Sequence, residues 1–123
     1  MLHIVLFSDM PDRMRLFVES LSADPEVRLD RATTEAEVLG LVRDKCPHLV
    51  IFDSGASEPD SLELVRKTIS VNAMVNTAVV SSLSENDFHE KSEGLGILCA
   101  LPPRPGPGDA AVLLRKLRAV LVR

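Results

Sequence analysis

The sequence predicts an α/β protein in which one parallel, doubly wound sheet of five strands is covered by five helices. Short apolar segments alternate with amphipathic segments along the whole chain, and this alternation is typical of a doubly wound sheet. The run Leu49-Val50-Ile51-Phe52 is apolar at every position, as in a strand buried on both faces. The chain has 123 residues and 46% hydrophobic content, so we expect a single domain over residues 1–123.

The first strand is expected over residues 2–7, and Met10-Pro11 then opens a helix, because proline suits a first helical turn. The apolar residues of this helix recur at helical spacing; they are Met14, Phe17, Val18 and Leu21. Residues 27–32 alternate apolar and charged side chains, which indicates an edge strand.

A second helix is expected after Thr34, because Thr34 and Glu37 have the spacing of a capping box. We expect it to bury Leu39, Val42 and Cys46 and to end at Pro47. The central strand follows and ends at Asp53.

In the second half of the chain, Asp60 is the expected cap of a third helix that buries Leu62, Val65 and Ile69. A fourth strand is expected over residues 76–81. The capping signal at Ser84 begins a helix whose large apolar residues are Phe88 and Leu95 alone, so we expect that helix to be weakly anchored.

The fifth strand is expected over residues 97–101, and a proline-rich turn follows it. Asp109 is the expected cap of the last helix. The apolar face of this helix is broad and consists of Ala110, Leu113, Leu114, Leu117, Val120 and Leu121.

Composition excludes several classes of function. A net charge of -4 and an aromatic content of 3% argue against a nucleic-acid partner. No apolar run approaches the roughly 20 residues of a membrane span, and the first residues lack the pattern of a signal peptide, so a cytoplasmic protein is expected. Cys46 and Cys99 are expected to be buried, reduced thiols.

Two carboxylates follow the first and third strands, Asp9 and Asp53. In a flavodoxin-like sheet with strand order 2-1-3-4-5 these strands are neighbours, and the ligand crevice lies beside them. An oxygen-rich, water-accessible pair of carboxylates suits Mg²⁺. The sequence therefore predicts a candidate site for chemistry at this edge.

On these residues the chain resembles the receiver domains of two-component response regulators, of the chemotaxis type. The separation of Asp9 and Asp53, 44 residues, is that of the family. The resemblance covers essentially the whole chain and rests on four motifs: Phe7-Ser8-Asp9-Met10-Pro11, Leu49-Val50-Ile51-Phe52-Asp53, Asp60-Ser61-Leu62-Glu63-Leu64 and Val79-Val80-Ser81-Ser82.

The resemblance implies a role for each matching residue. Asp53 would be the phospho-acceptor, and Asp9, Asp53 and the backbone carbonyl of Gly55 would bind Mg²⁺. Ser82 would supply the hydroxyl that turns toward the phosphoryl group. The implied partners are a sensor histidine kinase or phosphotransfer protein and a downstream protein effector, and the chain would not itself be an enzyme.

The chain also departs from the family pattern. Ser8 stands where the family usually has an acid, and the lysine at the end of the fifth strand is missing. Arg104 is a candidate substitute, 22 residues after Ser82 as in the family, although the position of Gly96 points instead to Pro103. An arginine does not simply replace a compact ammonium group.

Plainer interpretations stand beside these roles. Asp53 is then a surface residue that ends a strand, Asp9 a helix cap, Ser82 a turn hydroxyl and Arg104 a solvated loop cation. The alternative function is a pseudo-receiver, a phosphorylation-independent interaction or dimerisation module. A homodimer would form through the last helix, where Val112 and Val122 add apolar surface. A hydrolase or nucleotide-binding enzyme is disfavoured, because the chain lacks the glycine-rich loops and the nucleophile–histidine pair of such enzymes.

Overall fold

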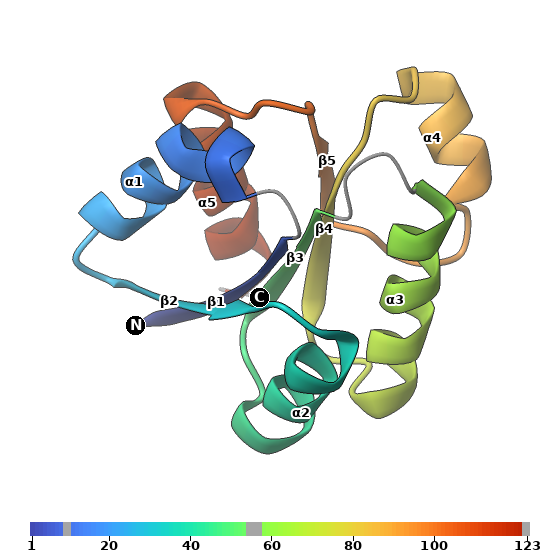
Figure 1. Ribbon diagram of the computed structural model, residues 1–123, viewed down its shortest axis with the longest axis horizontal. Helices are drawn as coiled ribbons and strands as arrows, with labels where there is room; N and C mark the ends of the chain where they lie inside the picture. The colour runs from blue at the N-terminus through green and yellow to red at the C-terminus, as the bar shows by residue number, and fades with distance from the viewer. Residues whose placement is uncertain (9–10, 54–57, 122–123) are drawn as a thin grey trace.

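A computed structural model of the protein describes residues 1–8, 11–53 and 58–121. Five parallel strands form one sheet in the order β2-β1-β3-β4-β5, with helices on both of its faces (Figure 1). The predicted fold class and strand order are therefore confirmed. The strands are β1 (Leu2–Ser8), β2 (Val27–Ala32), β3 (Leu49–Asp53), β4 (Asn76–Val80) and β5 (Cys99–Leu101). The helices are the 3-10 helix η1 (Pro11–Met14), α1 (Arg15–Ala23), α2 (Glu35–Lys45), α3 (Glu58–Val71), α4 (Glu85–Lys91) and α5 (Pro107–Leu121).

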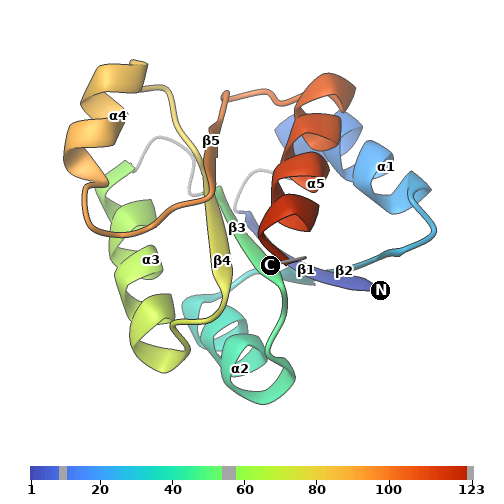
Figure 2. The same cartoon turned by 180° about the vertical axis from the view of Figure 1, so that it is seen from behind.

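Two apolar clusters lie on opposite faces of the sheet. Ile4 and Leu6 of β1 pack into the cluster beneath α1 and α5, whereas Val5 packs into the cluster beneath α2 and α3. Successive strand residues point to opposite faces, so a strand covered on both sides is apolar throughout. The view from behind shows α1 and α5 side by side on their face of the sheet (Figure 2). Arg118 of α5 and Asp24 after α1 join the two helices by an ion pair of 2.8 Å.

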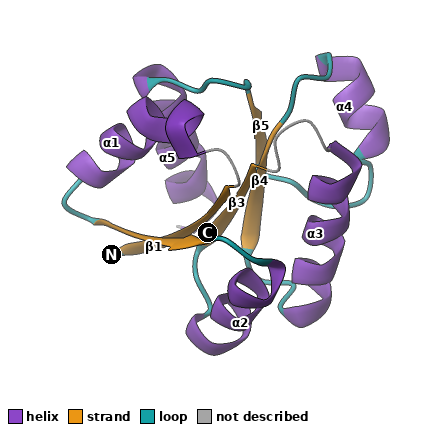
Figure 3. Cartoon of the chain, in the orientation of Figure 1, coloured by secondary structure: helices purple, strands orange, loops and turns teal. Residues whose placement is uncertain are grey.

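The two edge strands of the sheet differ in length, and β5 is the shorter one (Figure 3). The strand β2 forms one edge, as its alternating pattern predicts, and β5 forms the other. Beside β5, α4 is short, and its cap is the predicted one: the Ser84 hydroxyl accepts a hydrogen bond from the Asp87 N–H at 3.2 Å. Phe88 and Leu95 are only half-buried, which agrees with a weakly anchored helix. Within the described residues, no helix is long and apolar enough to cross a membrane.

Two of the predicted helix caps are wrong. The helix α3 begins at Glu58, so Asp60 lies inside its first turn. Likewise α5 begins at Pro107, and the Asp109 carboxylate accepts a hydrogen bond from the Gly106 N–H at 2.8 Å from within the first turn. Both helices have a proline in the first turn, where its missing N–H costs nothing, and this lets them begin before the aspartates.

The second helix has the predicted cap but a different buried stripe. The Thr34 hydroxyl accepts a hydrogen bond from the Glu37 N–H at 3.1 Å. Val38 and Val42 are fully buried, whereas Cys46 is exposed and left-handed, with φ 47°. The prediction of a buried Cys46 is therefore wrong, because the chain leaves the helix at this residue to enter β3.

The two thiols should differ in reactivity. Cys46 is exposed, whereas Cys99 is half-buried and burial raises the pKa of its thiol. Because the thiolate is the reactive species, we expect iodoacetamide to modify Cys46 at least about tenfold faster than Cys99 at mildly alkaline pH. Mass spectrometry of Cys46→Ser and Cys99→Ser, each with one remaining thiol, measures the two rates. Equal rates would contradict the different environments of the two thiols.

Candidate functional site

The candidate site lies where β1 and β3 end side by side. The register of these strands pairs Ser8 with Asp53 and Phe7 with Phe52. The two rings pack against each other beneath the site, with centroids 6.3 Å apart. The chain leaves β1 toward β2 on one side, and β3 begins the other half of the sheet. Asp53 therefore lies at the point where the strand order reverses, which is the usual ligand position in such sheets.

The carboxylate of Asp53 is fully buried, with 0% of the residue exposed, so the expectation of a water-accessible carboxylate and the plainer interpretation of a surface residue are both wrong for Asp53. The Ser8 hydroxyl donates to its Oδ2 at 2.9 Å. Arg13 donates to the same oxygen from Nε at 3.2 Å, and its Nη2 donates to Oδ1. The guanidinium thus contacts both carboxylate oxygens in a bidentate ion pair, which is a strong and directional arrangement. A buried carboxylate needs such compensation for its charge.

Arg13 was missed by the sequence reasoning, although it dominates this site. It belongs to η1, the 3-10 turn that follows β1, and its side chain is 16% exposed. The next residue, Met14, is fully buried under the sheet, so the turn is anchored beside Asp53. A basic residue just after the first strand was the available signal. Ser8, considered only as a missing acid, proves to be a hydrogen-bond donor to Asp53.

Ser82 and Arg104 lie on loops at the same end of the sheet. Ser82 is exposed, two residues beyond the end of β4. Its neighbour Ser81 is buried, and the Ser81 N–H donates to the Leu101 carbonyl at 2.8 Å. Arg104 is exposed on the loop between β5 and α5, and in the described part of the chain no hydrogen bond or ion pair joins it to another residue. The roles predicted for Ser82 and Arg104 stay predictions.

Of the three residues predicted to bind Mg²⁺, the structure describes Asp53. The other two, Asp9 and Gly55, lie outside the described residues. The third, Asp53, already has both carboxylate oxygens bonded by Ser8 and Arg13. Among residues 1–8, 11–53 and 58–121, no cluster of three His, Cys, Asp or Glu side chains could hold a metal. This arrangement does not fit a metal ion on Asp53 while Arg13 is in place.

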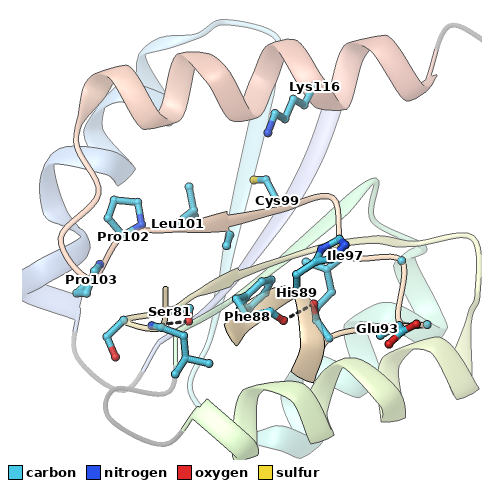
Figure 4. Close-up of a pocket in the computed structure, with 16 residues that line it drawn as sticks. Ser81, Phe88, His89, Glu93, Ile97, Cys99, Leu101, Pro102, Pro103 and Lys116 are labelled. Atoms are coloured by element: carbon cyan, nitrogen blue, oxygen red, sulfur yellow. Dashed lines mark hydrogen bonds between the residues drawn. The ribbon is translucent and has the colours of Figure 1, made fainter. Parts of the chain in front are cut away.

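A groove of about 770 Å³ lies at the β5 edge of the sheet, between α4, β5 and the start of the proline-rich loop (Figure 4). Phe88 and Ile97 supply apolar surface, and Lys116 of α5 stands at its rim beyond Cys99. Ser82 also lines the groove. The loop after β4 thus forms part of an open surface at the opposite edge of the sheet from β2.

The strand order 2-1-3-4-5 is that of a flavodoxin-like doubly wound sheet, and solved receiver domains of the CheY type share this fold. This confirms, at the level of the fold, the resemblance found in the sequence. The response regulator domain of CheB from Thermotoga maritima superimposes with a TM-score of 0.77 and 15% identity, covering 99% of this chain and 97% of that domain. The CheY-like receiver domain protein of Methanospirillum hungatei gives a TM-score of 0.77 and 18% identity, over 99% of this chain and 94% of that one.

A sequence relative gives a second comparison. The protein-glutamate methylesterase/protein-glutamine glutaminase 3 of Anaeromyxobacter dehalogenans is 32% identical over 112 residues, which are 89% of this chain. The matched region is 32% of the relative, so this chain spans about a third of the relative's length. No protein-family model matches the chain.

Proposed function

We propose that this chain is a receiver-type signalling module, in which Asp53 is the control point and a protein-binding face carries the output. The observation that supports this best is the position of Asp53, at the carboxyl end of β3 and in register with the end of β1. Ligands of doubly wound sheets bind at this position. The receiver fold and the family spacing of Asp9 and Asp53 add to this support.

In this proposal Asp53 accepts a phosphoryl group from the phosphohistidine of a sensor kinase or phosphotransfer protein. A carboxylate oxygen attacks phosphorus, so that a P–O bond forms while the P–N bond to histidine breaks. The aspartyl phosphate adds up to about two negative charges and three acceptor oxygens, and Ser82 is the hydroxyl proposed to donate to it. Mg²⁺, with Asp9 and Gly55 as further ligands, belongs to this proposal through the family resemblance alone.

The proposed output face consists of the groove and the exposed side of α5. Val112 and Leu121 are 38% and 41% exposed on this helix, and Lys116 lies between them in sequence. This mixture of apolar and basic side chains suits an interface with a protein effector or with a second copy of the chain. Val122, the other residue predicted to contribute, lies outside the described residues.

The second candidate function is a phosphorylation-independent interaction module. It is favoured by the burial of Asp53 beneath Arg13, since a phosphoryl donor must reach the carboxylate. The same face of α4, β5 and α5 would then bind its partner without a chemical signal.

Phosphodonor treatment distinguishes the two candidates. We expect acetyl phosphate with Mg²⁺ to add one phosphoryl group, detected by intact-protein mass, and to shift the amide NMR signals of Phe52 and Ser82. Asp53→Asn should abolish both effects, because it removes the nucleophile. Asp12→Asn is the matched control, since Asp12 is an exposed acid on η1, and it should behave as wild type. An unmodified wild-type protein would favour the phosphorylation-independent module.

A further inference from the structure

We infer that Arg13 is the resident counter-cation of Asp53 and that it decides whether this carboxylate can bind a divalent cation. The inference deepens the proposed function, because it takes Asp53 as the control point. It assigns to Arg13 a gating role that the sequence pattern does not indicate. A divalent cation then reaches the Asp53 carboxylate only when the side chain of Arg13 leaves it, so Arg13 weakens cation binding by the wild type.

The first support is the geometry of the pair. Arg13 Nε and Ser8 Oγ share the Oδ2 atom of Asp53, at 3.2 and 2.9 Å, and Arg13 Nη2 takes Oδ1. A divalent cation binds a carboxylate through the same lone pairs. A metal and this guanidinium therefore compete directly for the two oxygens.

The second support is burial together with charge. Asp53 is 0% exposed and the Arg13 side chain only 16%, so bulk water screens their attraction little. A guanidinium remains protonated at all physiological pH values. The negative charge of Asp53, which would otherwise attract a cation to this edge, is already balanced.

The third support is that the position of Arg13 is built into the fold. Arg13 belongs to η1, whose last residue, Met14, is fully buried in the cluster beneath α1 and α5. Arg13 can therefore leave the carboxylate only if its side chain rotates outward while its backbone stays in place. A buried ion pair is often no more stabilising than an apolar pair of the same size. The chemical consequence of this ion pair is that both oxygens of the Asp53 carboxylate are bonded by Arg13.

The experiment measures divalent cation binding, not phosphorylation. Wild-type protein, Arg13→Gln and Arg15→Gln are titrated with Mg²⁺ by calorimetry, and with Mn²⁺ while the broadening of the Phe52 and Asp53 amide NMR signals is followed. Glutamine keeps a hydrogen-bond donor but removes the charge. Arg15 is exposed at the start of α1, so Arg15→Gln removes the same charge near the site without touching Asp53.

We expect Arg13→Gln to bind both cations at least about tenfold more tightly than wild type, with broadening centred on Asp53. Arg15→Gln should match wild type. The double variant Arg13→Gln with Asp53→Asn should lose the gained affinity, which places the cation on this carboxylate. Saturable binding by the wild type with the affinity of Arg13→Gln, or no gain in Arg13→Gln, would overturn the inference. If Arg13→Gln does not fold, Arg13→Lys replaces it in the same titrations, because a compact ammonium cannot bond both carboxylate oxygens as the guanidinium fork does. Tighter binding than wild type then supports the inference, and equal binding overturns it.

The outcomes also separate this inference from the proposed function. If Arg13→Gln binds the cation but acetyl phosphate leaves Asp53 unmodified, phosphoryl acceptance fails while the gating role of Arg13 stands. If the wild type and Arg13→Gln bind the cation equally and both are phosphorylated, the gating role fails while phosphoryl acceptance stands.

Discussion

Replacing Arg13 by alanine should lower the free energy of unfolding by about 3–5 kcal/mol, since it leaves a buried carboxylate without its cation. Asp53 is fully buried, and the substitution removes both hydrogen bonds from the Arg13 guanidinium to its carboxylate oxygens. Removing one partner of a buried pair costs far more than the pair itself contributes. Denaturant unfolding followed by circular dichroism measures the change.

The control and a double variant make this prediction specific. Arg15→Ala, an exposed substitution two residues away, should change the free energy of unfolding by no more than about 0.5 kcal/mol. Adding Asp53→Ala to Arg13→Ala should recover part of the lost stability, because the unpaired charge is removed as well. Independent, additive losses from the two substitutions would contradict a direct buried pair.

Phe52→Ala should also lower the free energy of unfolding by about 3–5 kcal/mol. Phe52 is fully buried in the cluster beneath α2 and α3, and its ring packs on that of Phe7. Truncation removes apolar contacts and leaves a cavity that a sheet between two helical layers cannot readily fill. Since Phe52 precedes Asp53, the amide NMR signals of Asp53 and Ser8 should shift as well.

Val112→Ala provides the comparison for Phe52→Ala. Val112 is 38% exposed on α5, so its loss should change the free energy of unfolding by no more than about 0.5 kcal/mol. The same denaturant measurement applies to both variants. A loss below about 1 kcal/mol for Phe52→Ala would show that the core beneath the site repacks.

Local signals in the sequence predicted some caps and failed at others. Thr34 and Ser84 cap their helices as predicted, because each is followed by a residue whose N–H it can bond within one turn. Asp60 and Asp109 carry a similar signal but lie inside helices that begin earlier at prolines or next to them. A capping residue and a first-turn residue are both favourable places for an aspartate, so the sequence leaves the helix start open by a few residues.

Candidate site residues differ in the same way. Asp53 was predictable because an apolar run ends at it, and strand ends are where doubly wound sheets place their ligands. Arg13 was not, because its bond to Asp53 joins residues 40 positions apart. Whether a cation after the first strand turns inward or toward water depends on the turn that carries it, and this turn is set by the buried neighbour Met14.

The alternation of apolar and amphipathic segments by itself determined the class of this protein, because strands covered on both faces and right-handed crossovers leave few other arrangements. It also determined that a carboxylate stands at the end of the central strand. Only the tertiary structure decided what that carboxylate meets. The register of β1 against β3 brings Ser8 to Asp53, and the packing of η1 brings Arg13 over it. Such contacts depend on distances in space, and periodicity along a chain carries no information about them.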